Sequence, residues 1–141
     1  YADSEEKKTA RRKSIEFIRT YGAYDFLRTA IPGLFCKEWA EAHPAELEAL
    51  VEKGRHFSSG ALIQYYEAMI TRPDRTEVLR NFPGPILFII GQHDNAVPFA
   101  QSMQQCYLPL QSHVHILRNS AHMGMWEETG LVNHFFLSFL G

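Results

Sequence analysis

The sequence predicts an α/β fold in which a helical segment, residues 1–81, precedes a β-α-β-α unit, residues 82–141. Before about Arg80, apolar residues recur at helical spacing and no strand pattern occurs. After Pro83, two short apolar runs, Ile86–Ile90 and His113–Leu117, are separated by a helical stretch. A strand, a helix and a strand within about thirty residues form a βαβ unit, with parallel strands and a right-handed crossover.

The first helix is expected from Asp3 to Tyr21. Asp3 and Glu6 have the spacing of a capping box, and Gly22 is typical of a helix end. The residues predicted to face inward are Ala10, Ser14, Phe17, Ile18 and Tyr21.

Further helices follow in the same segment. Short helices are expected on either side of Pro32-Gly33, and Pro44 starts another that ends at Gly54. The clearest helix is capped by Ser58 or Ser59 and stops before Pro73. Its apolar positions at helical spacing are Leu62, Tyr65, Tyr66, Met69 and Ile70.

The first strand, Ile86–Ile90, organises the second segment. Five consecutive apolar residues between turn residues are typical of a strand that is covered on both faces. A helix should run from Pro98 to about Cys106 after this strand, and a closing helix from Leu131 to Leu140 after the second strand. The residues of the closing helix predicted to face inward are Phe135, Phe136 and Phe139.

Composition excludes several classes of protein. Of 141 residues, 45% are apolar and 21% charged, and the net charge of −2 argues against a nucleic-acid-binding protein. No membrane span or signal peptide is expected. Cys36 and Cys106 lack metal-site spacing and predict reduced thiols in a cytoplasmic setting. The chain begins at Tyr1 inside charged helical sequence, which indicates a processed protein or a piece of a longer one.

Asp94 and His122 form the candidate catalytic pair. Each follows one of the two strands, and a right-handed βαβ unit places both at the same edge of the sheet. An aspartate there can accept a hydrogen bond from imidazole Nδ1, which fixes the tautomer and stabilises the imidazolium formed when Nε2 takes a proton. The alternatives are a structural turn histidine and a turn aspartate.

Two segments, Phe88–Pro98 (FIIGQHDNAVP) and Asn119–Glu127 (NSAHMGMWE), resemble the carboxyl-terminal part of the α/β-hydrolase fold family. In that family the penultimate strand ends in G-x-x-D, and a histidine follows the last strand, with an acidic residue a few positions later. The resemblance implies that Asp94 is the acid and His122 the base of a catalytic triad. It also implies that residues 1–81 are the helical lid inserted before the penultimate strand.

The sequence departs from the family in lacking its nucleophile. The family places a serine in a G-x-S-x-G elbow ahead of the lid, and no such motif occurs. The nucleophile and most of the sheet are therefore expected outside this chain, which should be an incomplete domain and inactive alone. We expect it to need the amino-terminal half of its own protein or a second copy. The serines that lack the strand-to-helix setting are Ser4, Ser14, Ser58, Ser59, Ser102, Ser112, Ser120 and Ser138.

Other residues are weaker candidates for a site. Met123, Trp126, Tyr65 and Tyr66 are candidate substrate-binding residues, and core packing is the alternative for each. His113 and His115 share one face of a strand and raise the alternative of a metal site, but no carboxylate or thiol accompanies them, so no metal or cofactor is expected.

The sequence thus predicts a hydrolase of small molecules with an ester-like or related bond. Because the nucleophile is not visible, an aspartate nucleophile that opens epoxides or haloalkanes is the alternative within the enzymes. The alternative class is a non-enzymatic interaction module, which would use the exposed sheet edge and apolar faces to bind a partner chain.

Overall fold

In the computed structural model, which describes residues 1–141, contacts divide the chain into two units. Unit 1 comprises Tyr1–Pro32 and Pro44–Arg75, and unit 2 comprises Gly33–His43 and Thr76–Gly141. Gly33–His43 and the helix before the first strand group with the sheet in unit 2. Two hydrogen bonds join Gly33–His43 to residues after the second strand: the His122 N–H donates to the Leu34 carbonyl, and the Cys36 N–H donates to Glu127.

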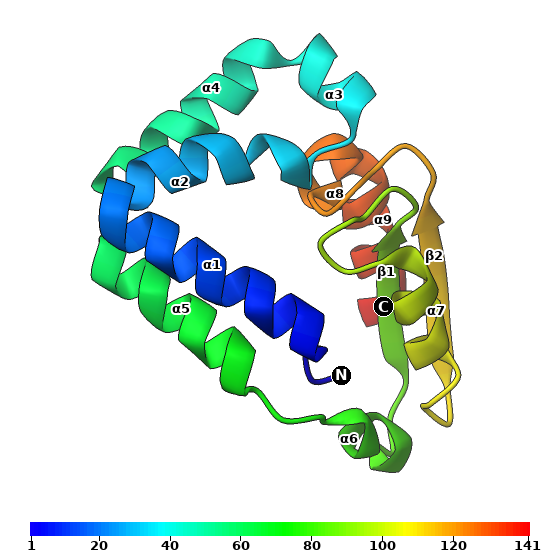
Figure 1. Cartoon of the computed structure of the whole chain (residues 1–141). Helices are drawn as coiled ribbons and strands as arrows, with labels where there is room; N and C mark the ends of the chain where they lie inside the picture. Colours follow the sequence, from blue (N-terminus) through cyan, green and yellow to red (C-terminus); the bar gives the residue numbers. More distant parts are fainter. The chain divides into compact units, whose positions relative to one another are not determined.

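Unit 1 is entirely helical. It contains α1 (Glu5–Tyr21), α2 (Ala23–Ala30), α4 (Pro44–Lys53), the 3₁₀ turn η2 (Gly54–His56) and α5 (Ser59–Thr71). Helix α1 packs against both α2 and α5 (Figure 1). The core of the unit is formed by Ile18, Ala23 and Leu62, with Phe26, Leu27, Ile63 and Tyr66 packed around them.

The start of α1 differs from the predicted capping box. Ser4 is the N-cap, and its side chain accepts a hydrogen bond from the Lys7 N–H. The Asp3 side chain is buried instead, where it accepts hydrogen bonds from Arg11 and Arg72. A buried aspartate with two arginine partners is satisfied by ion pairs, so the neighbouring serine takes the capping role.

The inner face of α1 is also shifted from the prediction. Ile15 and Ile18 are the buried residues of the helix, whereas Tyr21 is 60% exposed. The predicted end of the helix is confirmed, because Gly22 has a φ of 89° and its N–H donates to the Ile18 carbonyl.

Unit 2 contains the sheet. Its elements are α3 (Lys37–Ala42), α6 (Thr76–Asn81), β1 (Ile86–Gly91), α7 (Phe99–Cys106), β2 (Ser112–Leu117), α8 (Gly124–Glu127) and α9 (Thr129–Leu140), and the 3₁₀ turn η1 (Pro32–Leu34) leads into it. The two strands are parallel, with a register from Ile86↔Ser112 to Gly91↔Leu117. The predicted β-α-β-α unit is confirmed.

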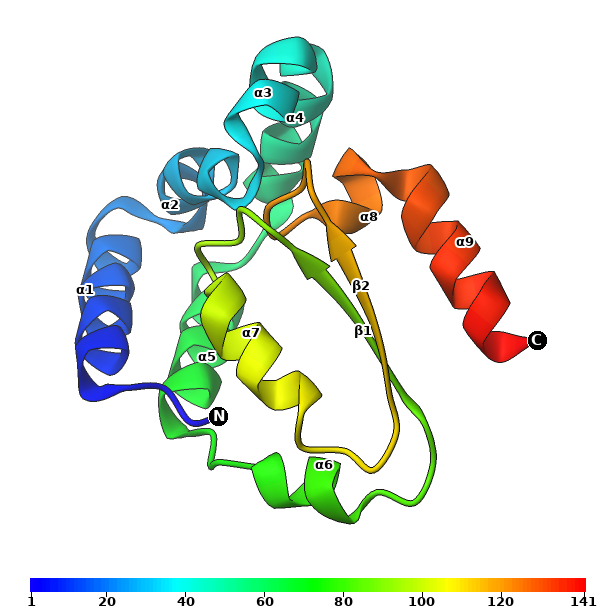
Figure 2. The same cartoon turned by 90° about the vertical axis from the view of Figure 1, so that its right-hand side faces the viewer.

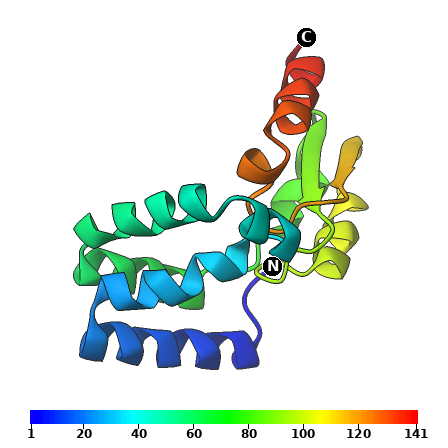
Figure 3. The same ribbon diagram turned by 90° about the horizontal axis from the view of Figure 1, so that it is seen from above.

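Helices α7 and α9 cover opposite faces of the two strands (Figures 2 and 3). On the α9 face, the His115 ring stacks on Phe135 at 3.8 Å, and His113 meets Phe139 edge-on at 5.3 Å. Both strand histidines are therefore packing residues of this face, and they do not form part of a cluster that could hold a metal ion.

The predicted inner face of α9 needs one correction. Val132 is its buried residue, Phe135 and Phe139 are half-buried, and Phe136 is 49% exposed. A sheet of two strands is too narrow to cover the whole apolar side of a twelve-residue helix. The other large apolar residues left exposed in unit 2 are Val78, Phe82, Tyr107, Leu110, Val114, Ile116, Met125, Trp126, Leu131, Leu137 and Leu140.

Both cysteines are buried free thiols. Burial raises the pKa of Cys36, whose Sγ donates to Glu38, and burial also raises the pKa of Cys106. These thiols are thereby kept protonated and poorly nucleophilic. Among the helices, none combines the length and the apolar character that crossing a bilayer requires.

Candidate active site

Asp94 lies in the turn that follows β1. Its N–H approaches the Gly91 carbonyl at 3.3 Å, so the chain reverses directly after the strand. Its Oδ1 accepts the backbone N–H groups of Ala96 (2.8 Å) and Val97 (2.9 Å). An aspartate that bonds its own backbone two and three residues ahead forms a tight local turn. These bonds hold the carboxylate in one orientation and leave Oδ2 for another donor.

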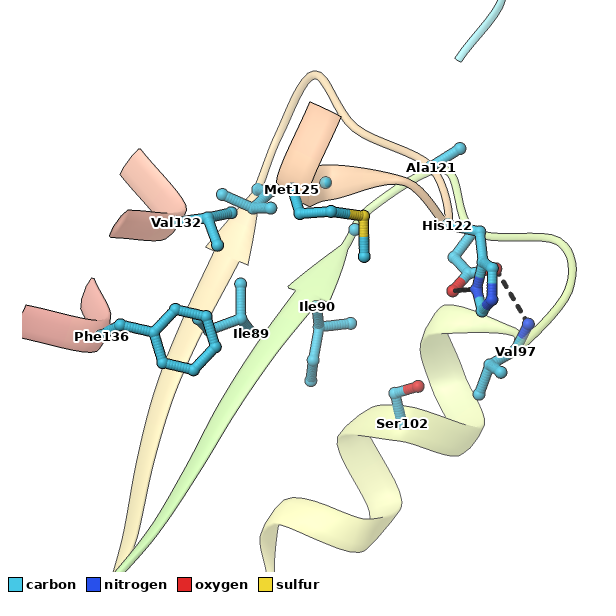
Figure 4. Close-up of a pocket in the computed structure, with 13 residues that line it drawn as sticks. Ile89, Ile90, Val97, Ser102, Ala121, His122, Met125, Val132 and Phe136 are labelled. Atoms are coloured by element: carbon cyan, nitrogen blue, oxygen red, sulfur yellow. Dashed lines mark hydrogen bonds and ion pairs between the residues drawn. The ribbon is translucent and has the colours of Figure 1, made fainter. Parts of the chain in front are cut away.

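That donor is His122, in the loop after β2. His122 Nδ1 lies 2.9 Å from Asp94 Oδ2 (Figure 4). Because a carboxylate only accepts hydrogen bonds, Nδ1 is the donor, and in the neutral imidazole this tautomer leaves the lone pair on Nε2. The Asp94 side chain is 11% exposed and that of His122 is 39% exposed. The arrangement is a largely covered, partly buried carboxylate next to an imidazole that solvent can reach.

Hydrogen bonds hold the loops after the two strands together. The Gln92 N–H donates to the Leu117 carbonyl at 2.9 Å, and the His93 N–H donates to the Ser120 carbonyl at 3.0 Å. His93 Nε2 also lies 3.0 Å from the Arg118 carbonyl. His93 is therefore a link between the Asp94 and His122 loops, a role that its place in the sequence did not reveal.

Gly91 permits the close approach of these loops. A Cβ at this position would lie 1.9 Å from the Ala121 carbonyl oxygen and 2.8 Å from the Ser120 oxygen. Both are backbone atoms, which cannot swing away as a flexible side chain does. Glycine is required here because the backbone next to His122 occupies the place of a side chain.

Two glutamates hold the His122 loop from the other side. Glu127 accepts the N–H groups of Ala121 and Met123, which flank His122, and that of Cys36. Glu128 accepts the Ser120 hydroxyl and the Asn119 N–H. Sequence reasoning included Glu127 only in the family resemblance. Its signal was an acidic residue soon after a polar turn that must satisfy its own N–H groups.

A cavity of about 360 Å³ reaches the pair. It is lined by consecutive residues of β1, Ile89 to Gly91, by Ser102 of α7 and by Phe136 of α9 (Figure 4). Asp94 and His122 also line it, from the loops that follow the two strands. Consecutive strand residues face opposite sides of a sheet, and α7 and α9 cover opposite faces. The cavity therefore runs around the edge of β1 that has no partner strand.

The four candidate substrate-binding residues lie in different parts of the structure. Met123 is the N-cap of α8 and Trp126 lies within it, but neither lines the cavity, whereas Met125 does. Tyr65 and Tyr66 lie on α5 of unit 1. Tyr66 packs edge-on against Phe26 at 5.4 Å, and burial raises its pKa, so it has a clear packing role.

Ser120 is the one serine in a loop that leads from a strand to a helix, between β2 and α8. Ser102 lines the cavity but lies inside α7, and Ser120 is fully buried with its hydroxyl donated to Glu128. The Asp94–His122 pair therefore has no exposed serine hydroxyl from a strand-to-helix loop beside it in this chain.

Comparisons with known proteins agree with this partial site. No family model and no curated protein matches the sequence. Solved structures match closely. A thermophilic esterase from Thermogutta terrifontis aligns with a TM-score of 0.87 and 24% identity, over 99% of this chain and 51% of its own. An enol-lactonase from Burkholderia xenovorans aligns with a TM-score of 0.82 and 20% identity, over 91% and 48%. A bromoperoxidase from Bacillus anthracis aligns with a TM-score of 0.76 and 19% identity, over 89% and 48%.

This is part of the α/β-hydrolase fold. The chain spans about half the length of the solved structures it matches. The α/β-hydrolase fold predicted from two short segments is confirmed, as is its incompleteness, since the sheet has only two strands.

Proposed function

We propose that this chain is the carboxyl-terminal part of an α/β-hydrolase enzyme and that Asp94 and His122 are its catalytic acid and base. The hydrogen bond from His122 Nδ1 to Asp94 Oδ2, at the carboxyl end of two parallel strands, supports this proposal more than any other observation. The Asp94 carboxylate is held by two backbone N–H groups and is mostly covered, whereas the His122 side chain is 39% exposed.

The pair would act in two proton transfers. His122 Nε2 takes the proton of a hydroxyl nucleophile supplied by the rest of the protein as the nucleophile attacks the ester carbonyl. The imidazolium, stabilised by Asp94, then gives this proton to the leaving alkoxide as the ester bond breaks. Water deacylates the enzyme by the same two steps in turn.

The substrate would be a small molecule with an ester-like bond. An esterase and an enol-lactonase are among the matched structures, and both names describe the opening of an acyl–oxygen bond. Residues 1–81 would form the helical lid, with Tyr65 and Tyr66 as its candidate substrate contacts and Met123 and Trp126 as those of unit 2. The predicted cytoplasmic setting remains a prediction.

The unpaired edge of β1 would receive the rest of the sheet. The cavity along this edge is lined mainly by apolar side chains from both faces. An unpaired strand edge also presents a row of backbone donors and acceptors. A strand from the amino-terminal half, or from a second copy, would satisfy these groups and cover Phe136.

The test uses the full-length protein that contains this chain and a short acyl p-nitrophenyl ester. We expect kcat to fall by about 10³- to 10⁴-fold in both His122→Ala and Asp94→Asn, since each removes one part of the proton-transfer pair. His56→Ala, which changes an exposed histidine of unit 1, is the matched control and should leave kcat unchanged. Equal activity of the wild type and all three variants would show that Asp94 and His122 are not the catalytic acid and base.

The exposed apolar residues of unit 2 also fit the second candidate, a non-enzymatic module that binds a partner chain. In that case full-length His122→Ala and Asp94→Asn would bind the partner as the wild type does, and no ester would be turned over. An aspartate nucleophile would be recognised by activity toward an epoxide or a haloalkane in place of the ester.

A further inference from the structure

We infer that Glu127 is the positioning residue of the site and that it ties the backbone around His122 to the segment Gly33–His43. The inference rests on the proposed function, because it concerns the same histidine. It adds a residue that touches neither Asp94 nor the imidazole ring in any hydrogen bond of the structure.

The Glu127 carboxylate gathers three backbone N–H groups. Oε1 accepts from Cys36 at 2.6 Å and from Ala121 at 3.1 Å. Oε2 accepts from Ala121 at 3.0 Å and from Met123 at 3.1 Å. Since Ala121 and Met123 are the residues before and after His122, one carboxylate fixes the peptide on each side of the candidate base. A carboxylate is the only side chain with enough acceptor sites for all of these donors.

The third donor connects the loop to a distant part of the chain. Cys36 is 91 positions from Glu127. Two residues before Cys36, the Leu34 carbonyl accepts the N–H of His122 itself at 2.9 Å. Every backbone N–H from Ala121 to Met123 is therefore bonded either to Glu127 or to Leu34. The backbone of His122 cannot rotate without breaking bonds to both.

The segment that makes these contacts is itself anchored. Phe35 and Cys36 are 6% exposed, and the Phe35 ring stacks on Trp39 at 4.7 Å. Trp39 in turn stacks on His43 at 4.4 Å. Along the chain, this short anchored segment follows Pro32 and precedes Pro44, the ends of the two stretches that make up unit 1.

Glu128 shows that a neighbouring glutamate does not share this role. It binds the Asn119 N–H and the Ser120 hydroxyl, on the side of the loop nearer β2. Glu127 alone binds on both sides of His122. Imidazole orientation depends on the backbone that carries it, and a displacement of about 1 Å in a reacting group costs about 100-fold in rate.

The experiment compares Glu127→Gln with wild type in the full-length protein. A glutamine has nearly the same shape but only one acceptor oxygen, and its NH₂ group would face N–H groups that are donors themselves. The variant therefore loses part of the hydrogen bonds that hold the His122 loop. We expect kcat on the acyl ester to fall by about 10- to 100-fold and KM to change by less than about threefold. The low-field proton NMR signal of the His122 Nδ1–H, bonded to Asp94, should broaden or disappear.

The matched control is Glu41→Gln, which changes an exposed glutamate of the same segment that pairs only with Lys37. It should leave kcat and the NMR signal unchanged. Glu127→Asp, which keeps the charge but shortens the reach, should give a smaller loss than Glu127→Gln. An unchanged kcat and an unchanged Nδ1–H signal in Glu127→Gln would overturn the inference.

The outcomes separate the two proposals. If His122→Ala retains activity, the proposed function fails, and the NMR signal in Glu127→Gln still tests the positioning role. If both Glu127 variants fail to fold, amide hydrogen exchange of the wild type tests whether Glu127 holds these N–H groups. Slow exchange of Cys36, Ala121 and Met123 supports the role of Glu127, and fast exchange at these amides overturns it.

Discussion

The hydrogen bond between Asp94 and His122 depends on residues that contact neither polar group. Gly91 leaves space for the Ala121 carbonyl, and His93 bonds the carbonyl of Arg118. The two loops can approach each other because the Ala121 carbonyl has space beside Gly91 and the Arg118 carbonyl has a hydrogen-bond partner in His93. At the scale of the residue, the absence of a side chain at Gly91 matters as much as the presence of His122.

Gly91→Ala should destabilise the protein by about 1–3 kcal/mol, because the new Cβ collides with backbone atoms that cannot move freely. Urea denaturation of the full-length protein measures this change. Gly130→Ala is the matched control, since nothing lies within 4 Å of its Cβ and it sits in a helix. It should be neutral or stabilising by up to about 1 kcal/mol. Equal stability of both variants would contradict the proposed close approach.

Asp3 provides a second prediction for single residues. Burial alone would raise the pKa of Asp3, but the hydrogen bond and charge of Arg11, together with Arg72, lower it below its usual 3.8. Asp3→Asn should therefore destabilise unit 1 by about 2–3 kcal/mol at neutral pH, because it removes the charge that pairs two arginines. Glu5→Gln breaks an exposed pair with Lys8 and should cost less than about 0.5 kcal/mol.

The effect of Asp3 should depend on pH in one direction. A carboxylate whose pKa is lower in the folded state stabilises the protein fully above its unfolded pKa, and this stabilisation is lost as pH falls through the folded value. The difference in unfolding free energy between wild type and Asp3→Asn should be complete at pH 6 and shrink below 3.8. A difference that stays constant from pH 6 to pH 2 would contradict the ion-pair assignment.

At the scale of the element, helix ends in unit 1 depend on two adjacent serines. Ser58 Oγ accepts the Ala61 N–H at the start of α5, at 3.1 Å. Ser59 Oγ accepts the Ala23 N–H at the start of α2, at 3.0 Å. Because Gly22 has no side chain to cap α2, a residue of another helix takes this role.

Ser58→Ala should lower the stability of the protein by about 1 kcal/mol, because the first turn of α5 loses its side-chain cap. Thermal denaturation of the full-length protein measures the change. Ser14→Ala is the control, since Ser14 lies within α1 and its hydroxyl only bonds back to the Ala10 carbonyl. The capping assignment is wrong if Ser14→Ala proves as destabilising as Ser58→Ala.

At the scale of the whole molecule, the sheet determines what the chain can do alone. Two strands leave one backbone edge of each without a partner strand. Phe136, Leu137 and Leu140 of α9 remain exposed, as do Val114 and Ile116 of β2. A soluble monomer rarely leaves so many large apolar residues uncovered on one small sheet.

The isolated 141-residue chain should therefore associate as its concentration rises and bind the hydrophobic dye ANS, and it should not hydrolyse an acyl ester. The full-length protein, assayed in parallel, should be a discrete species with little dye binding. Sedimentation velocity and a thermal melt measure whether the isolated chain associates and whether it melts cooperatively. A cooperatively melting monomer without dye binding, or measurable turnover by the chain alone, would contradict it.

Local sequence patterns determined the elements of this protein and their order. The strands at Ile86 and His113, the glycine end of α1 and the cap of α5 were all predictable, since periodicity, turn residues and caps act over a few neighbouring positions. Asp94 and His122 were predictable as a pair because parallel strands bring their carboxyl ends to one edge.

Only the tertiary structure decided which distant groups meet. Asp3 pairs with Arg72, Ser59 caps α2, and Glu127 binds Cys36, although none of these partners is near in sequence. It also decided that Phe136 lines the cavity and stays 49% exposed. Periodicity records which side of an element is apolar, whereas the atoms that satisfy a buried donor or fill the space beside a strand are set by chain segments far away.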